Sequence, residues 1–290
     1  MGSSADIRIS VALIARNRPE SLNQCLASVR SQTVQPFEIV VSDDSDPEFA
    51  PQLEAIANHW QCRYLRGPRR GMQANRNHAH LACQGTHVRT MDDDHEFPPD
   101  HFEKIQKAVE SDPKSVWVLA EYHEHPTAES IIHLPGELQP RGFRKPLANP
   151  DDCFAISDGA AIYPREIFNK HRFLEGLIYA GELEFGARLK ALGYRIRYCP
   201  DTYIIHHCGA YHEPEIVQKS QFIGAYLTYA CYFRDRWKTL ECLIYFLSKA
   251  LQTSLNINNS YFGLEDFWET WKLGNKYGQL FQDGKYDQMI

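Results

Sequence analysis

Short β-rich runs alternate with helical segments through the first hundred residues, and this alternation constrains the fold more than any other feature. The runs occupy residues 7–15, 37–42, 62–65 and 86–91. Between them, apolar residues recur at intervals of three and four, which is typical of helices packed by one face. A parallel strand pair needs a long crossover connection of this kind. The alternation therefore predicts an α/β fold with a mostly parallel sheet flanked by helices.

The composition is that of a globular protein, with 290 residues, 43% hydrophobic and 23% charged. A formal net charge of -6 argues against a nucleic-acid partner, which usually requires a basic face. The eight cysteines are scattered without a C-x-x-C pair, and no apolar leader stands at the N-terminus. We therefore expect a reduced, cytoplasmic protein. The most apolar late segment, residues 240–251, is too short to span a bilayer.

Polar residues follow three of the predicted strands at their C-terminal ends. They are Arg16 and Asn17 after the first strand, Asp43 and Asp44 after the second, and Asp92, Asp93 and Asp94 after the fourth. Ligands of open α/β sheets bind at this edge. A single acidic strand end is more often a solvated turn, whereas three polar ends on one edge favour a binding site.

With these residues in place, the sequence resembles the inverting nucleotide-sugar glycosyltransferases of family 2, which have the GT-A fold. The matching stretches are ISVALIARNRPESLNQCLASVRSQTVQPFEIVVSDDS and GMQANRNHAHLACQGTHVRTMDDDHEFPPDHFE, with weaker matches in DGAAIYPREIF and AGELEFGARLKALGYRIRYCPDTYIIHHCG. The resemblance implies a GT-A catalytic domain over residues 1–210, with a nucleotide-sugar half at about 7–103 and an acceptor half at about 104–210. Residues 211–290 would be a helical C-terminal extension. The segment YFRDRW is similar to one in rhamnosyltransferase-like members, which would be the nearest subgroup.

The resemblance also implies a UDP- or dTDP-sugar donor. Asp44 would accept a hydrogen bond from N3–H of uracil or thymine. Asp43 would do so instead if the match to the family is shifted by one residue. Ala15 and Arg16 stand where the family often has Thr-Tyr, so Arg16 would stack on the base. Asn17 is expected to cap the following helix. The expected nucleotide-binding set is Ala15, Arg16, Asn17, Asp43, Asp44, Arg76, Asp92 and Asp93.

Arg76 has two possible roles in this scheme. It could pair with a phosphate or carboxylate of the donor in bidentate fashion. Alternatively, it could form a salt bridge to Asp43 or Asp44 that only shapes the turn. The sequence does not favour either role.

A divalent cation, Mn²⁺ or Mg²⁺, would neutralise the leaving pyrophosphate. Alternate residues of an extended segment point the same way, so Asp92 and Asp94 are expected to lie together. Asp94 would ligate the metal directly, Asp92 would bind metal or ribose, and Asp93 would face the protein. The resemblance implies a histidine ligand as well; His207 is the first choice and His206 the alternative.

The acceptor side is expected around the start of a helix in AGELEFGARL. Glu182 stands where the family keeps its general base, which takes the proton of the attacking hydroxyl. Glu184, Asp158 and Gly159 would lie on the acceptor side. The Pro-rich residues 125–152 are expected to form an irregular loop over the site. Three histidines would belong to that loop region: His123, His125 and His133.

Residues 214–255 have helical spacing and could pack on the core, form a homodimer or lie on a membrane surface. Packing is the commonest reason for such an apolar stripe, and the balanced charges place membrane contact second. The expected activity is metal-dependent, inverting transfer of a hexosyl or deoxyhexosyl group to a hydroxyl of a glycan or glycoconjugate, as in polysaccharide biosynthesis.

Two other functions remain as alternatives. A sugar nucleotidyltransferase would need a Gly-rich phosphate loop after the first strand, where LIARNRPES has no glycine. An inactive sugar-nucleotide-binding module is disfavoured because the acids of the predicted site and His207 are all present.

Overall fold

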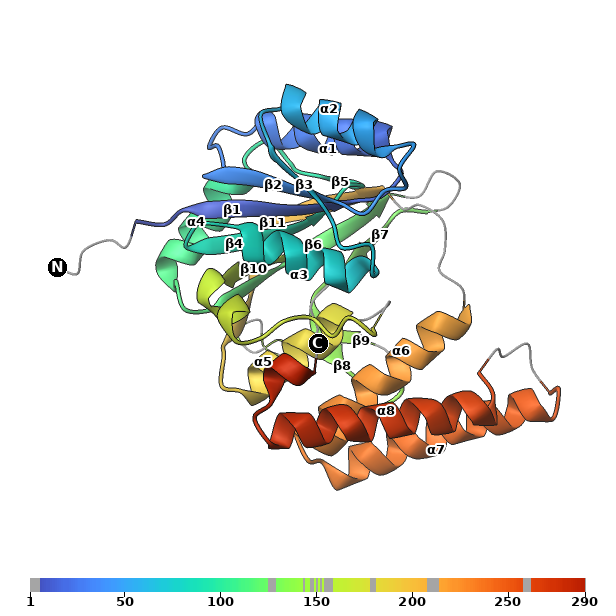
Figure 1. Cartoon of the computed structure of the whole chain (residues 1–290). Coiled ribbons are helices and arrows are strands. Elements are labelled where there is room, and N and C mark those ends of the chain that lie inside the picture. Colours follow the sequence, from blue (N-terminus) through green and yellow to red (C-terminus); the bar gives the residue numbers. More distant parts are fainter. Residues whose placement is uncertain are drawn as a thin grey trace.

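The computed structural model of the chain describes residues 6–124, 129–142, 144–146, 149, 151, 153, 159–177, 181–207, 214–257 and 262–289. A curled sheet lies between helices, and further helices gather at one end of it (Figure 1). The predicted fold class, an α/β GT-A fold with a helical C-terminal region, is confirmed.

The first strands follow the predicted runs within a few residues. They are β1 (Ile9–Ala15), β2 (Glu38–Asp43), β3 (Arg63–Arg66) and β4 (His87–Asp92). All four strands are parallel. A helix joins each strand to the next and provides the long crossover that parallel strands need. Their C-terminal ends therefore meet at one edge of the sheet.

The remaining strands complete the sheet in the order β3-β2-β1-β4-β10-β6-β11-β5, with β7 paired to β6. They are β5 (His95–Glu96), β6 (Val116–Glu124), β7 (Ile131–His133), β10 (Ala161–Pro164) and β11 (Ile196–His207). β11 runs parallel to β6 but antiparallel to β5. A bulge interrupts the β6–β11 pairing, since residues 198 and 203 of β11 pair with residues 118 and 120 of β6.

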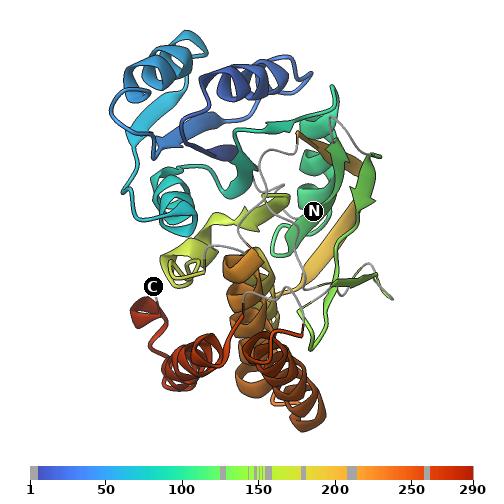
Figure 2. The ribbon, with the colours of Figure 1, turned by 90° about the vertical axis from the view of Figure 1, so that its right-hand side faces the viewer.

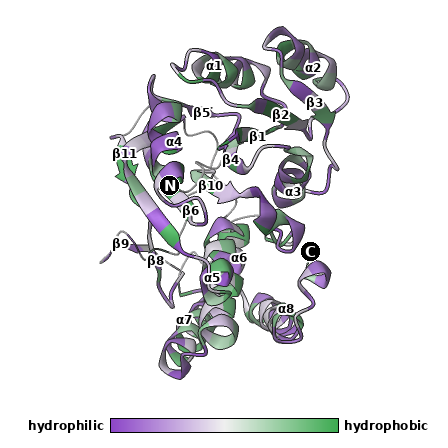
Figure 3. Cartoon of the chain, turned by 90° about the vertical axis from the view of Figure 1, so that its left-hand side faces the viewer, coloured by the Kyte–Doolittle hydropathy of each residue, from purple (hydrophilic) through white to green (hydrophobic). Residues whose placement is uncertain are grey.

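Helices cover both faces of the sheet. One group is α1 (Pro19–Arg30), α2 (Ala50–His59) and α4 (His101–Ser111), and the other includes α3 (Met72–Ala82), the short η1 (Arg165–Asn169) and α5 (Gly181–Ala191). The C-terminal helices are α6 (Pro214–Tyr226), the π-helical turn η2 (Leu227–Tyr232), α7 (Arg236–Ser254), α8 (Leu264–Gln282) and the short η3 (Tyr286–Gln288). They lie at the end of the molecule away from α1 and α2 (Figures 2 and 3).

Strand β1 is buried on both faces and divides the core in two. Val11 and Leu13 pack with residues of α1, α2 and α4, whereas Ala12 and Ile14 pack with residues of α3 and α5. This follows from the alternation of side chains along a strand. The second core continues into the C-terminal helices, where the ring of Phe222 stacks on Phe246 and Phe267. The C-terminal helices are therefore packed against the sheet domain by one continuous core.

The expectation of an irregular loop over residues 125–152 is wrong in part. Strand β7 extends the main sheet, and β8 (Gly136–Leu138) pairs with β9 (Arg144–Pro146) as a hairpin. The β-branched Ile131 and Ile132 favour a strand. The proline content of the segment, on which the expected loop was based, does not reflect this preference. His123 and His133 consequently lie on β6 and β7, and His125 is outside the described residues.

Candidate active site

A turn of acidic residues links β4 to β5 at the C-terminal edge of the sheet. Asp92 ends β4, and Asp93 and Asp94 form the turn. Both carboxylate oxygens of Asp92 accept hydrogen bonds from Nη2 of Arg76, at 2.9 Å and 2.6 Å. Asp92 is therefore held by α3 at the mouth of the sheet.

Arg76 also forms an ion pair with Glu182, in the first turn of α5. The ion pairs found for Arg76 among the described residues are thus with Asp92 and Glu182, whereas the turn-shaping alternative supposed Asp43 or Asp44. Arg76 is only 1% exposed, so its guanidinium offers almost no surface to a phosphate in this conformation. The residue links the predicted nucleotide half to the predicted acceptor half.

Asp93 and Asp94 share a second arginine, Arg18, which immediately precedes α1. The guanidinium pairs with Asp93 and, at 2.6 Å, with Oδ2 of Asp94. Asp93 is fully buried, and its Oδ2 accepts a hydrogen bond from the backbone N–H of Arg16 at 3.2 Å. Burial raises the pKa of Asp93 to about 8, against the opposing charge of Arg18. Asp93 thus lies at the cleft with little surface of its own, which does not suit direct nucleotide contact.

Three histidines form a row across neighbouring strands beside this turn. His95 of β5 is the cross-strand partner of His206 on β11, and His206 is the partner of His123 on β6. Cross-strand partners project from the same face of a sheet at close range. The ring of His206 accordingly lies 4.7 Å from each of the other two rings, centroid to centroid.

Asp94 faces this row and completes a cluster of potential metal ligands. Its Oδ2 lies 3.6 Å from Nε2 of His206, and its Oδ1 lies 3.8 Å from Nε2 of His95. The three ligand atoms are all within 4.8 Å of one another. Burial acts to raise the pKa of Asp94, but His206, His95 and Arg18 together lower it well below the usual value.

The cluster fits a divalent metal ion. Oδ1 of Asp94 is buried and has no hydrogen-bond partner among the described residues. A carboxylate with two imidazole nitrogens is a donor set that divalent first-row metals accept. Asp92 does not belong to this cluster, because both of its oxygens are bonded to Arg76.

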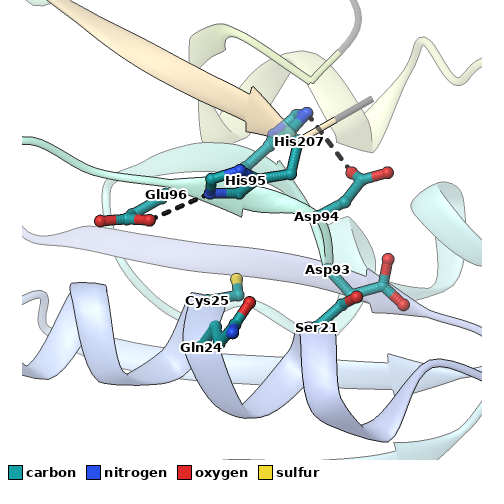
Figure 4. Close-up of a pocket in the computed structure, with 8 residues that line it drawn as sticks. All are labelled: Ser21, Gln24, Cys25, Asp93, Asp94, His95, Glu96 and His207. Atoms are coloured by element: carbon teal, nitrogen blue, oxygen red, sulfur yellow. Dashed lines mark hydrogen bonds and ion pairs between the residues drawn. The ribbon is translucent and has the colours of Figure 1, made fainter. Parts of the chain in front are cut away.

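His207 lies on the opposite face of β11, so the geometry favours the alternative, His206, over the first choice of histidine ligand. Successive residues of a strand point to opposite faces. The Nε2 of His207 lies 3.0 Å from Glu96, and its Nδ1 lies 2.9 Å from Glu124. Figure 4 shows dashed contacts between His207 and Glu96 and between His95 and Asp94, with Asp93 near Ser21 of α1.

A cleft with a cavity volume of about 170 Å³ opens at the ends of β1, β2 and β4. Five of the predicted nucleotide-binding residues line it: Ala15, Arg16, Asp44, Asp92 and Asp93. The volume is below the roughly 300–1,000 Å³ of sites for drug-sized ligands. The cleft would therefore hold part of a donor, such as its base and ribose.

The structure distinguishes the two aspartates after β2. Asp44 lines the cleft, and its Oδ1 accepts a hydrogen bond from the backbone N–H of Arg69 at 2.9 Å. Burial raises the pKa of Asp44, and the Arg69 N–H acts in the opposite direction. Asp43 is fully buried and accepts hydrogen bonds from Ser45 N–H at 2.7 Å and from Arg66 at 2.5 Å. Asp43 therefore supports the loop, and a uracil contact by Asp43 does not agree with its burial.

Asn17 neither caps α1 nor faces the cleft. Its Nδ2 donates to Asp46 at 2.7 Å, and its Oδ1 accepts from the backbone N–H of Asp46 at 2.8 Å. The residue has a φ of 56°, which asparagine tolerates better than most residues. Helix α1 begins at Pro19, without a side-chain cap. Asn17 thus fastens the β1–α1 connection to the loop after β2.

Glu184 is buried and paired, which does not suit an acceptor contact. Nε of Arg188 lies 2.8 Å from Oε1 of Glu184, and the hydroxyl of Tyr232 donates to the same oxygen. The side chain is fully buried. Glu184 therefore attaches α5 to η2 in the core, because it lies two residues beyond Glu182 on a different face of the helix.

Gly159 lies against the acidic turn, and Asp158 is outside the described residues. Gly159 has a φ of 67°, and a Cβ atom there would come within 2.7 Å of His95. Its carbonyl accepts a hydrogen bond from Arg89 at 2.5 Å. A glycine is therefore needed where this chain passes the histidine row.

Several residues of the site were not predicted as its members from the sequence. They are Arg18, His95, Glu121 and His123. His95 follows the three aspartates directly, and Glu121 and His123 are spaced for one face of a strand. His95 could have been found from its neighbours in the sequence. The membership of Glu121 and His123 depends on strand pairing, which the sequence does not display.

The parallel sheet, the cleft at its carboxyl edge and the acidic turn define a GT-A-like glycosyltransferase fold. The sequence profile of glycosyl transferase family 2 matches residues 10–172, more than half of the chain, and the chain belongs to this family. It is 27% identical over 113 residues to the uncharacterized glycosyltransferase YwdF of Bacillus subtilis (strain 168). That alignment covers 36% of this chain and 39% of the relative, so the two share less than half of their lengths.

Solved structures agree with the fold. GalNAc-T7 with UDP, GalNAc and Mn²⁺ superposes with a TM-score of 0.66 and 19% identity, over 80% of this chain and 49% of that one. S. aureus TarS 1–349 in complex with UDP gives 0.59 and 17% identity, over 91% and 81% of the two chains. At these identities the likeness shows the fold alone.

Proposed function

We propose that the protein transfers a sugar from a UDP- or dTDP-sugar to a hydroxyl of a glycan or glycoconjugate, with inversion and with a divalent metal ion. The observation that carries the proposal is the juxtaposition of two features at one sheet edge. The cleft lined by Asp44 and Arg16 adjoins the acidic turn, and the Asp94–His95–His206 cluster lies on that same turn. UDP is present in one structural neighbour and UDP with Mn²⁺ in another, which supports the same reading.

In this proposal Asp94 and His206 hold the metal, and His95 lies within reach as a third ligand. The bound cation, Mn²⁺ or Mg²⁺, would neutralise charge that develops on the leaving diphosphate. Asp44 would accept the N3–H of the base, and Arg16, which is exposed at the cleft, would stack on it. Asp92 would keep its hydrogen bonds to Arg76, and the free lone pairs of its carboxylate would accept a hydrogen bond from a ribose hydroxyl.

We propose Glu182 as the general base for the acceptor hydroxyl. Its position in the first turn of α5 favours the ionised form through the helix dipole. In this structure the side chain is 1% exposed and paired with Arg76. Proton transfer therefore requires that the Glu182–Arg76 ion pair opens when the acceptor binds. Arg76 would then stay bonded to Asp92 only.

We also propose that α7 pairs with α7 of a second copy. The exposed face of α7 carries large apolar residues at alternating intervals of three and four: Trp237, Leu240, Ile244, Leu247 and Leu251. Trp237 is 82% exposed and Ile244 is 59% exposed. Heptad spacing of this kind is the signature of a helix–helix seam. On either side of Leu240 the surface is hollowed, with cavity volumes of about 480 and 560 Å³.

A second copy fits this face better than a lipid surface. A two-fold interface places the same surface of both copies in contact, so the apolar residues of one α7 would pack against those of the other. In an antiparallel pair, Glu241 of one copy would approach Lys249 of the other at both ends. Two such faces would bury on the order of 1,200 Å², near the lower limit of stable interfaces. In the part of the chain that the structure describes, no helix is long and apolar enough to cross a bilayer.

Three finer assignments stay proposals. They are a nucleotide-sugar half at about 7–103 with an acceptor half at about 104–210, a rhamnosyltransferase-like subgroup based on YFRDRW, and a cytoplasmic location. The decisive experiment for the function is a binding and transfer panel. UDP- and dTDP-sugars are compared with GDP- and CMP-sugars, in Mn²⁺ and in EDTA. Transfer that is equal in EDTA and Mn²⁺, or tighter binding of GDP than of UDP and dTDP, would contradict the proposal.

A further inference from the structure

A buried carboxylate, Glu121 of β6, lies directly behind His206. Nδ1 of His206 is 3.7 Å from Oε2 of Glu121, and Nε2 of the same ring is 3.6 Å from Oδ2 of Asp94. The imidazole is therefore placed between two carboxylates, with one nitrogen toward each. Glu121 is 1% exposed, whereas Asp94 lies at the edge of the site.

We infer that Glu121 is a positioning residue that holds the His206 ring with Nε2 directed at Asp94. The inference rests on the proposed metal site at Asp94 and His206. A histidine that ligates a metal through one nitrogen usually donates the other N–H to a carboxylate, which fixes both tautomer and ring orientation. Glu121 has the chemistry of that carboxylate and lies 3.7 Å from Nδ1 of His206, within a small ring movement of a hydrogen bond. Glu121, His123 and His206 also form a second group of potential metal ligands. In the proposed arrangement the metal lies on the Asp94 side of His206, so Glu121 would act through His206.

The surroundings of Glu121 support this role. Nε2 of His123 lies 2.7 Å from Oε2 of Glu121, and the His123 ring lies 4.1 Å from that of His133. His123 thus fixes the same carboxylate oxygen that faces His206. Oε1 of Glu121 has no hydrogen-bond partner among the described residues. Buried charges are normally paired, and the partners of Glu121 are His123 and His206.

The same two strands carry a second acid–histidine pair that differs in its surroundings. Glu124 and His207 are cross-strand partners, one residue beyond His123 and His206, with Nδ1 of His207 2.9 Å from Glu124. This pair lies on the other face of the strands, is substantially exposed, and directs Nε2 of His207 to Glu96. Glu124→Gln therefore removes an equivalent carboxylate from a histidine that does not face Asp94.

The test is Mn²⁺ binding to the full chain with UDP present, measured by electron paramagnetic resonance of free Mn²⁺. We expect Glu121→Gln to weaken Mn²⁺ binding by about 10–100-fold, and Glu124→Gln to leave it unchanged. Glu121→Asp keeps the charge at a greater distance, so it should fall between the wild type and Glu121→Gln. Thermal melting without metal establishes that each variant is folded.

A second measurement uses Mg²⁺, which is diamagnetic. In the wild type with Mg²⁺ and UDP bound, ¹⁵N chemical shifts of the His206 ring should report a single tautomer protonated at Nδ1, and in Glu121→Gln a mixture. A folded Glu121→Gln variant with wild-type Mn²⁺ affinity and an unchanged tautomer would overturn the role of Glu121 while leaving the metal site intact. Absence of Mn²⁺ binding by the wild type would instead overturn the metal site, and the inference with it.

Discussion

Arg76 and Asp92 are joined by two hydrogen bonds, 2.9 Å and 2.6 Å long, between the middle of α3 and the end of β4. The same guanidinium also pairs with Glu182. One buried arginine therefore ties the acid expected near the donor to the acid proposed as the base. Any movement of α5 at its first turn changes the charge balance around Asp92.

Glu182→Gln should reduce sugar transfer by about 10²–10⁴-fold, the usual contribution of a positioned general base. UDP binding should change little, because Asp92 keeps its bonds to Arg76. The measurement is single-turnover transfer with a competent acceptor, alongside UDP affinity. Near-native turnover of Glu182→Gln, or a product with the donor's anomeric configuration, would rule out this base.

Glu184→Gln is the matched comparison and should act on stability. Glu184 makes a fully buried ion pair with Arg188, and breaking such a pair by removing one partner typically costs about 3–5 kcal/mol. We expect a lower urea midpoint with a near-normal rate for the protein that remains folded. A wild-type midpoint with a large loss of rate would mean that Glu184 acts in the reaction.

His206→Ala should weaken Mn²⁺ binding at least tenfold, and His207→Ala should not. The reason is the alternation along β11, which directs His206 to Asp94 and His207 to Glu96 and Glu124. Titration of Mn²⁺ into each variant with UDP present separates the two. The reverse order of effects would restore His207 as the ligand.

Asp44→Asn should weaken UDP and dTDP binding by about tenfold, because the amide is a weaker acceptor for the N3–H of the base than a carboxylate. Asp46→Asn is the control, since Asp46 is paired with Asn17 and Arg69 outside the cleft. Isothermal titration with UDP measures both. Equal affinities in wild type and Asp44→Asn would remove Asp44 from the base-binding role.

Ile244→Glu combined with Leu247→Glu should convert a dimer to a monomer. Two charges in the middle of the α7 seam would be buried in the paired state at high cost. Leu81→Glu is the control, because Leu81 is a lone exposed leucine on α3. Light scattering after size exclusion gives the mass. A wild type that stays monomeric at high concentration would refute the seam, and flotation of that monomer with anionic vesicles would assign the face to lipid instead.

Stability should fall with acid partly through His80. This ring is buried, stacks on Phe168 and bonds Thr90, and burial with the charge of Arg76 lowers its pKa to about 3. The unfolded chain, with a histidine pKa of about 6.5, takes up the proton first. The contribution of His80 is therefore complete above about pH 6.5 and is lost as the pH falls toward 3.

The expected loss from this one group is up to about 1.4 kcal/mol per pH unit. His80→Gln should show a shallower decrease between pH 6.5 and 4.5 in urea unfolding, whereas His59→Gln, at an exposed position on α2, should follow the wild type. Identical pH profiles for all three proteins would contradict the assignment.

The sequence predicted the elements that depend on local pattern. Strands β1 to β4 and the helices between them were recognised from alternation and spacing, because each is set by residues close along the chain. Their common edge placed Asp44 and the Asp92–Asp94 turn together. The prediction was weaker for side chains whose partners lie far along the chain. Arg76 pairs with Asp92 at the end of β4 and with Glu182 on α5, and Asn17 bonds Asp46 in the loop after β2.

The histidine cluster shows the limit most clearly. His95, His206 and His123 are brought together only by the pairing of β5 with β11 and of β11 with β6. Strand registry changes face with every single-residue shift, so the choice between His206 and His207 could not be made from the sequence. Pairing information was needed, and neither composition nor spacing supplies it.

The bulge in β11 between residues 198 and 203 has a consequence for how this family can diverge. If the bulge keeps its four-residue length, loss of one residue within 199–202 would shift the pairing that follows by one residue, which would place His207 opposite His123 and direct it at Asp94. The metal ligand would then change identity although no ligand residue had been substituted. A sequence alignment that compares only residue identities at positions 206 and 207 would miss this change of ligand, because the length of the chain segment that contains residues 199–202 decides which histidine faces Asp94.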